Sequence, residues 1–148
     1  MDGAARDAYK LYHDYISFDT THMVNMYNMP CAPFIGINRY GQSIQLGCGF
    51  MRHERIANFF WLFQTFLEAM DGLHPLNIII DQDQGMRTTI LLVFLDIIHR
   101  NCRWHIMQKK VQEKLGPLAA KHEQLRRDFN EIIDYSLTPA EFELNGQR

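Results

Sequence analysis

The sequence contains no long hydrophobic run, no recognisable export signal and few cysteines. No apolar stretch approaches the roughly 18–20 residues that a membrane-spanning helix needs, so we expect no membrane association. The first seven residues lack a basic segment followed by an apolar one, and we therefore expect no signal peptide. The three cysteines, Cys31, Cys48 and Cys102, are odd in number and form no Cys-x-x-Cys motif, which favours a reducing, intracellular compartment.

Common catalytic motifs are absent as well. The sequence has no Walker phosphate-binding loop, G-x-G-x-x-G, H-E-x-x-H or G-x-S-x-G, which removes the most familiar nucleotide-binding, zinc-protease and serine-hydrolase classes. Internal repeats, low-complexity tracts and flexible linkers are also lacking. What remains is 148 residues, of which 47% are hydrophobic and 22% charged, a length and composition typical of one globular domain.

Charge is unevenly distributed, although the net charge of −2 does not by itself indicate a nucleic-acid-binding protein. Residues 100–127 hold eight basic and two acidic side chains, a balance of +6, and the rest of the chain carries −8. Such asymmetry predicts a cationic face beside an acidic site, or alternatively an ordinary solvated helix surface. With DNA as a partner, the candidate phosphate contacts are Arg103, Lys109, Lys110 and Lys114.

The hydrophobic pattern predicts a mixed α/β domain. Runs of β-branched and aromatic residues, a hairpin turn containing Gly41 and amphipathic stretches define the expected elements. In chain order these are a strand at 15–18, hairpin strands at 34–38 and 43–48, a helix at 54–70, a strand at 76–81, a helix at 85–94, a strand at 97–104, and helices at 105–115 and 118–135. This is the element order of a ribonuclease-H-like core, with a sheet part antiparallel and part parallel and flanked by helices. We expect that core at 1–116 and a helical extension at 117–148.

The helix expected at 54–70 carries a cluster of aromatic residues: Phe59, Phe60, Trp61, Phe63 and Phe66. Their helical spacing favours a place in the core over a base-stacking surface, with Trp61 off the main stripe and exposed. Asp71-Gly72 follows, and we expect the glycine to end the helix in the left-handed conformation.

Two of the predicted strands run directly into an aspartate, Asp19 and Asp81, which are 62 positions apart (81 − 19). If these strands are neighbours, both carboxylates lie at the rim of the sheet and can share Mg²⁺ or Mn²⁺, the usual machinery of in-line displacement at phosphorus. The alternative is that each aspartate caps a loop or a helix start. Asp83 points to the same side as Asp81 in an extended segment, where it is a further ligand or raises the pKa of its neighbour.

His99, Cys102 and His105 recur every three residues. Cys102 and His105 look like half of a zinc site, but four ligands are expected and no second pair follows, so we expect no zinc site within this chain alone. Burial of the pair at the sheet edge, where it stabilises the turn from strand to helix, is the alternative. Nucleophilic catalysis by Cys102 lacks an orienting third group.

An ordered set of short motifs extends along most of the chain. They are Phe18-Asp19-Thr20-Thr21, Tyr27-Asn28-Met29-Pro30, Ala32-Pro33-Phe34, Gly36-Ile37-Asn38, Gly41-Gln42-Ser43, Leu46-Gly47-Cys48, Trp61-Leu62-Phe63, Asp81-Gln82-Asp83, Cys102-x-Trp104-His105 and Ser136-Leu137-Thr138-Pro139. Together they resemble the transposase core of plant proteins related to far-red impaired response factors, which derive from Mutator-like transposases. A set this long and this ordered is far more specific than any single motif.

The resemblance implies a ribonuclease-H-like fold in nuclear, DNA-associated proteins, many of which regulate transcription in light signalling. It implies that Asp19 and Asp81 match the first two acids of the family's Asp-Asp-Glu triad, and that Cys102 and His105 match its Cys-x-x-His signature. The family's third acid lies beyond a helical insertion that this sequence does not reach, so we expect an incomplete triad. Glu141 matches a family position but is not assigned to catalysis.

The sequence departs from the family at several points. The family's N-terminal zinc-binding DNA-recognition domain and C-terminal Cys/His-rich module are not part of it, and Arg52-His53 replaces a more acidic helix start, which discards a favourable charge. Thr138-Pro139-Ala140-Glu141 carries the signature of a helix start, yet only seven residues follow. We therefore expect a truncated extension, with a frayed tail as the alternative.

Three hypotheses follow for function. The leading one is a domesticated transposase core without catalysis, which regulates transcription in the nucleus with DNA and related transcription regulators as partners. The second is a transposase or nuclease that retains activity with Mg²⁺ or Mn²⁺. The third is a truncated fragment with only a protein-interaction role.

Overall fold

The computed structural model describes residues 3–20, 29, 31–107, 116, 122–136 and 138–145. The chain divides into two compact units, Met1–His105 and Ile106–Arg148. The boundary expected near residue 116 stays a prediction, because most of the residues around it lie outside the described ranges. No helix in those ranges has the length and apolar content needed to cross a bilayer.

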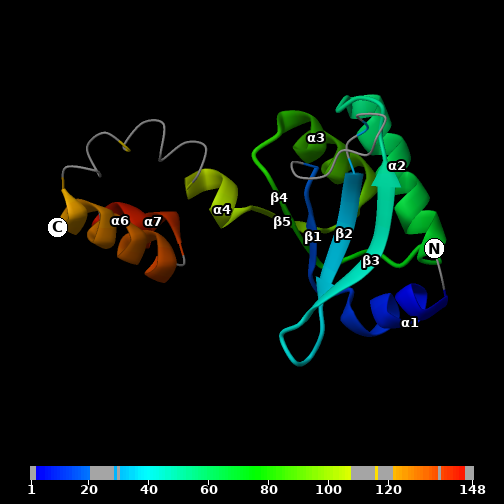
Figure 1. The fold of residues 1–148 in the computed structure, drawn as a ribbon, viewed down its shortest axis with the longest axis horizontal. Helices are drawn as coiled ribbons and strands as arrows, with labels where there is room; N and C mark the ends of the chain where they lie inside the picture. The colour runs from blue at the N-terminus through cyan, green and yellow to red at the C-terminus, as the bar shows by residue number, and fades with distance from the viewer. Residues whose placement is uncertain are drawn as a thin grey trace. The chain divides into compact units, whose positions relative to one another are not determined.

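The first unit contains a five-stranded mixed sheet (Figure 1). Its strands are β1 (Ile16–Phe18), β2 (Cys31–Ile37), β3 (Ser43–Phe50), β4 (Asn77–Ile80) and β5 (Ile98–Asn101). The spatial order is β3-β2-β1-β4-β5, in which β1 to β3 pair antiparallel while β1, β4 and β5 pair parallel. The prediction of a mixed α/β domain with a part antiparallel, part parallel sheet is therefore confirmed.

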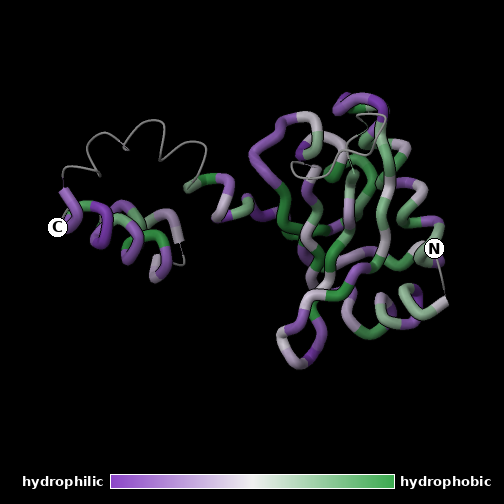
Figure 2. Tube along the Cα trace, viewed as in Figure 1, coloured by the Kyte–Doolittle hydropathy of each residue, from purple (hydrophilic) through white to green (hydrophobic). Residues whose placement is uncertain are grey.

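Three helices of this unit pack on one face of the sheet: α1 (Gly3–Tyr12), α2 (Ile56–Ala69) and α3 (Gln84–Val93). Each contributes buried side chains, such as Tyr9, Phe63 and Ile90, to a single core with the inward-facing residues of the strands. Figure 2 shows hydrophobic residues along both the strands and the helices of this unit. The sequence reading included α2 and α3 but missed α1, whose ten residues bury only Tyr9 completely.

Phenylalanines form the centre of the core, as the helical spacing predicted. The ring of Phe18 lies 4.8 Å from those of Phe34 and Phe63, measured between centroids. Trp61 is 57% exposed, also as predicted. Phe60 is 43% exposed, so its placement in the core was wrong; it lies beside Trp61, outside the stripe of α2 that holds Phe59 and Phe63.

The end of α2 differs from expectation in detail. The Gly72 N–H donates to the Leu67 carbonyl at 2.9 Å and the Asp71 N–H donates to the Glu68 carbonyl at 3.2 Å, the pair of bonds of a Schellman motif. Asp71, not Gly72, is therefore the first residue past the cap, with φ of 58°, and Gly72 follows with φ of 75°. A short polar side chain tolerates this left-handed conformation better than most others do.

The strand expected at 97–104 is shorter than predicted. β5 ends at Asn101, and α4 (Arg103–His105) follows at once. The last bond of the ladder runs from the Cys102 N–H to the Ile80 carbonyl at 2.6 Å. Because β4 itself ends at Ile80, β5 has no partner beyond this point, and the chain turns into helix.

The second unit contributes α6 (Glu123–Tyr135) and α7 (Pro139–Asn145). The predicted capping box forms at α7: the Glu141 N–H donates to Thr138 Oγ1, and the Thr138 N–H donates to Glu141 Oε2, both at 3.2 Å. The predicted helix start is thus confirmed. The helical residues expected at 108–115 and 118–121 lie outside the described ranges.

Candidate active site

Asp19 and Asp81 follow the two central parallel strands by one residue each. β1 and β4 are neighbours in the sheet, and their ladder pairs Ile16 with Ile78, an offset of 62 positions. The same offset separates the two aspartates, so the register continues to place Asp19 beside Asp81 at one end of the sheet. The expectation that the two strands are neighbours is confirmed.

His105 packs against the first of these aspartates. Its Nε2 atom lies 3.7 Å from Asp19 Oδ2; the histidine side chain is 2% exposed and the aspartate side chain 33%. The Trp104 ring stands at 90° to the imidazole with 4.8 Å between centroids, which fixes one side of the histidine. A protonated imidazole at this distance forms an ion pair with the carboxylate.

The helix that carries His105 is held close to the end of β4. The bond from the Cys102 N–H to the Ile80 carbonyl joins the start of this turn to the residue before Asp81. His105 is thereby brought to the same end of the sheet as both aspartates, while Cys102 remains half-buried. The arrangement agrees with the alternative in which this pair stabilises the turn from strand to helix.

Asp83 caps a helix. Its Oδ1 atom accepts a hydrogen bond from the Met86 N–H at 2.8 Å, at the N-terminus of α3. Asp81 Oδ1 in turn accepts from the Asp83 N–H at 2.9 Å, which shapes the turn between β4 and α3. The capping alternative is thus confirmed for Asp81, whereas the helix cap at Asp83 was not predicted.

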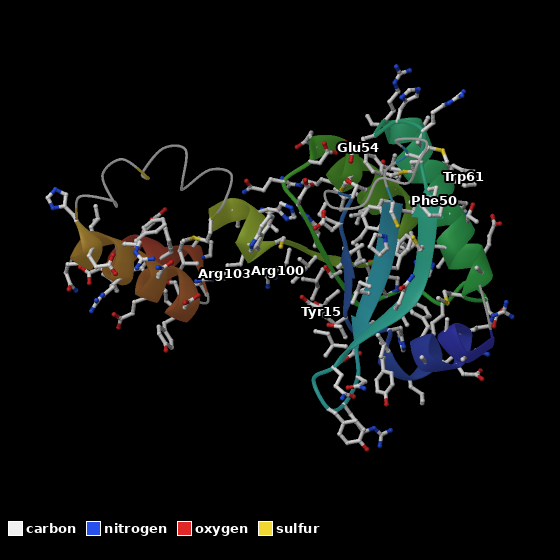
Figure 3. The ribbon with its side chains drawn as sticks, in the orientation of Figure 1. Tyr15, Phe50, Glu54, Trp61, Arg100 and Arg103 are labelled. Carbon is white, nitrogen blue, oxygen red and sulfur yellow. The ribbon has the colours of Figure 1, made fainter. Side chains whose placement is uncertain are left out.

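A contact between Thr20 and Glu54 was not anticipated. Thr20 is 7% exposed, and its hydroxyl donates a hydrogen bond to Glu54 Oε1. Glu54 lies in the segment that joins β3 to α2 and is labelled in Figure 3. The contact ties this segment to the residue after Asp19. Thr20 stood within a recognised motif, but nothing in the sequence links it to an acid 34 positions away.

A groove of about 380 Å³ runs along the sheet face opposite the three helices. Tyr15, Ser17 and Asp19 alternate along the chain with the core residues Ile16 and Phe18, and therefore lie on that opposite face. The remaining wall comes from the hairpin: Cys31, Pro33, Ile35, Ile37 and Ser43. Asp19 is the charged residue of a lining that is otherwise apolar or weakly polar.

Residues 15–109 match the MULE transposase domain family. The chain belongs to this family. FAR1-RELATED SEQUENCE 5 of Arabidopsis thaliana is 42% identical over 130 residues, which cover 88% of this chain and 16% of that protein. FAR-RED IMPAIRED RESPONSE 1 of Arabidopsis thaliana is 34% identical over 143 residues, which cover 97% and 17%. The chain thus spans about one sixth of the length of these curated relatives.

A solved structure is also similar at a lower level. A chain of the simian T-cell lymphotropic virus intasome in complex with PP2A regulatory subunit B56 gamma aligns with a TM-score of 0.42 and 15% identity, covering 91% of this chain and 48% of that one. A score of that size does not identify a fold.

The basic residues of the segment 100–127 are divided between the two units. Arg100 on β5 and Arg103 on α4 are exposed and belong to the first unit (Figure 3). The predicted contacts Lys109, Lys110 and Lys114 lie outside the described residues.

Part of the remaining charge is neutralised within α6. Arg126 Nη2 and Arg127 Nε approach Glu123 Oε1 at 2.6 Å and 3.4 Å. The hydrogen bond from Arg126 lowers the pKa of the Glu123 carboxyl. These two cations therefore form intrahelical pairs rather than an open cationic face.

Within the described ranges, no three His, Cys, Asp or Glu side chains gather closely enough to hold a metal ion. The candidate site comprises two aspartates in register, with a buried histidine against one of them. Such a pair fits a divalent cation that takes one or two carboxylates and completes its shell with water or phosphate oxygens. It does not by itself supply the ligands of a two-metal centre.

Proposed function

We propose that this chain is a domesticated Mutator-like transposase core with a ribonuclease-H-like sheet, and that it acts in DNA-associated transcription regulation in the nucleus without cutting DNA. Family membership and the strand order β3-β2-β1-β4-β5 support this proposal. The role in light signalling rests on the relatives named for the far-red impaired response. Because the chain covers only a sixth of those proteins, their whole activity is carried over only as a proposal.

The state of the two aspartates is the observation that carries the proposal. Asp81 Oδ1 is engaged by a backbone N–H, and Asp19 Oδ2 faces the buried His105. Asp19 and Asp81 would hold Mg²⁺ or Mn²⁺ through carboxylate oxygens, and the ion would polarise a phosphoryl oxygen. The His105 imidazole lies 3.7 Å from the same carboxylate that such a cation would bind. Within the described residues the two aspartates are fewer ligands than a two-metal centre needs, which favours weak ion binding over catalysis.

The absence of cleavage is tested with supercoiled plasmid DNA and millimolar Mg²⁺ or Mn²⁺. We expect no nicking by the chain or by its Asp19→Asn variant. Nicking by the unaltered chain that is lost in Asp19→Asn and kept in Asp7→Asn, an exposed aspartate on α1, would overturn the non-catalytic assignment. Gel electrophoresis of the plasmid forms gives the result directly.

Residual catalysis is the second candidate, and the shared register of Asp19 and Asp81 favours it. A retained metal centre should bind Mn²⁺ with a measurable heat in calorimetric titration. Asp81→Asn should then weaken the binding, while Asp7→Asn should leave it unchanged. No heat at millimolar Mn²⁺ removes this candidate and leaves the regulatory proposal in place.

DNA binding is tested by fluorescence anisotropy with a short labelled duplex between 50 and 200 mM salt. Phosphate contacts release counterions, so the affinity should fall with a log–log slope of about 0.9 per contact. Replacing Arg100 and Arg103 together by alanine should reduce that slope by about 2. Arg39→Ala, an exposed cation in the hairpin turn, is the matched control. An affinity that does not change with salt, or a slope that is unchanged in the double variant, contradicts phosphate binding by Arg100 and Arg103.

A further inference from the structure

Cys31 and Cys48 face each other across the β2–β3 hairpin. Their Sγ atoms are 2.8 Å apart, although both residues are free thiols. In the ladder Cys31 lies opposite Phe50 and Cys48 lies opposite Pro33, so the cysteines are diagonal neighbours on one face of the sheet. Cys31 is 8% exposed, whereas Cys48 is open to solvent. A small oxidant can therefore reach the pair from the Cys48 side.

The two sulfur atoms are already close to bonding distance. A disulfide bond is about 2.05 Å long, so the two sulfur atoms must approach by less than about 1 Å from their present separation. Cys48 is flanked by Gly47 and Gly49, which carry no side chain to obstruct a small adjustment of β3. Cys102, the third cysteine, is at the end of β5 on the far side of β1 and β4, and cannot compete for either partner.

We propose that Cys31 and Cys48 form a peroxide-responsive thiol pair that closes to an intramolecular disulfide between β2 and β3. One thiolate attacks hydrogen peroxide, its sulfur takes one oxygen as a sulfenic acid, and the other oxygen leaves as water after protonation. The second sulfur then displaces the sulfenic oxygen, which also leaves as water. Two thiols thereby lose two protons and two electrons, and one peroxide molecule becomes two water molecules.

The resting state of the pair is the dithiol. Partial burial, together with the neighbouring Cys31 sulfur, raises the pKa of Cys48 to about 11. Because the thiolate is the reactive form, oxidation should be slow near neutral pH and should accelerate as pH rises. In a reducing compartment the pair stays open until the peroxide concentration increases.

Closure would act on the groove beside the aspartates. Cys31 is the first residue of β2 and lines the same groove as Asp19. A covalent link to β3 would hold that wall of the groove in place. It would also restrict the unfolded chain, which should raise the melting temperature by about 5 °C.

The test uses the full chain, purified under reductant, then freed of it and treated with hydrogen peroxide. Intact-mass spectrometry should show a loss of about 2 Da, the two thiol hydrogens, reversed by dithiothreitol. Non-reducing peptide mapping should link Cys31 to Cys48. Cys102→Ser is the matched control and should behave as the unaltered chain does, whereas Cys31→Ser and Cys48→Ser should lose the link and gain oxygen instead.

Three outcomes would overturn the proposed link between Cys31 and Cys48. A disulfide that includes Cys102, or oxygen addition to Cys31 and Cys48 without loss of hydrogen in the unaltered chain, overturns the proposal. So does a link that forms only between two molecules, which gel filtration distinguishes. Peptide mapping of the unaltered chain decides the matter even if Cys31→Ser, at a buried position, fails to fold.

Discussion

The Tyr9 hydroxyl is buried where α1 meets the core, and it donates a hydrogen bond to the Leu73 carbonyl at 3.0 Å. The tyrosine ring also contacts Phe66 edge to face, with 5.4 Å between centroids. Burial raises the pKa of this phenol well above its ordinary value of 10.0. One side chain thus anchors a helix that the hydrophobic pattern alone did not reveal.

Replacing Tyr9 by phenylalanine tests that anchor. At pH 7.5 the variant should lose about 1–2 kcal/mol of unfolding free energy, because the Leu73 carbonyl loses its buried donor. The pKa of Tyr9 is higher in the folded state than in the unfolded state, so the folded protein holds the phenol proton more tightly. The resulting stabilisation is complete below pH 10.0 and is lost as the pH rises further. The difference in unfolding free energy between the unaltered chain and Tyr9→Phe should therefore be smaller at pH 10.5 than at pH 7.5. Urea denaturation at both pH values measures this difference. Tyr40→Phe, at a side chain that is 78% exposed, is the control. A difference that is the same at both pH values would contradict the role of the buried phenol.

Among single residues, the sequence could predict the positions that follow directly from regular strand pairing. Asp19 and Asp81 end two apolar strands, and parallel pairing alone brings them together. Asp83 was interpreted only as a neighbour of Asp81, and its use as the N-cap of α3 was missed. The contact of His105 with Asp19 joins residues 86 positions apart and depends on a turn after β5 that no local pattern specifies (105 − 19).

At the scale of elements, the packing of α2 on β3 depends on the absence of a side chain at Gly49. A Cβ atom there would lie 2.3 Å from Leu62 Cδ1, closer than real contacts allow. Gly49→Ala should therefore displace Leu62 and cost about 1–3 kcal/mol of unfolding free energy. Gly3→Ala, with no atom within 4 Å, should cost nothing.

A double-mutant cycle separates this clash from other effects of the substitution. In a Leu62→Ala background the extra methyl group has room, so Gly49→Ala should cost less than it does alone, with a coupling of about 0.5–3 kcal/mol. Chemical denaturation of the four proteins supplies the cycle. Strictly additive costs would show that the loss arises from the β3 backbone and not from Leu62.

Elements with a strong local pattern were predictable, and those defined by a distant partner were not. The turn of the hairpin was predicted correctly, although β2 begins at Cys31, three residues before the predicted strand. Asn38 and Gly41 shape this turn: Asn38 Oδ1 accepts from the Tyr40 and Gln42 N–H groups, and Gly41 has φ of 74°. The end of β5 was predicted wrongly because it is set by the length of β4, 21 positions earlier (101 − 80). The sequence contains no local signal for that limit.

At the scale of the whole molecule, the core is confined to the first unit. Every member of the buried cluster lies between Tyr9 and Phe94, and the second unit buries none of its described residues completely. A shortened chain of residues 1–107 should therefore unfold cooperatively, with a melting temperature within about 5 °C of the full chain. Circular dichroism and calorimetry of both proteins provide the comparison. A broad, non-cooperative transition would show that residues beyond 107 are needed for the fold.

The position of Asp19 relative to Asp81 depends on strand pairing, not on the number of residues between them. The hairpin, α2 and their connections make up most of the intervening segment, and insertions in those loops would leave both carboxylates where they are. One residue inserted within β1 or β4 would instead turn the following aspartate to the opposite face of the sheet. Distant relatives are therefore better aligned by their strand ladders than by counting positions, since evolution can lengthen the hairpin freely but cannot lengthen these two short strands.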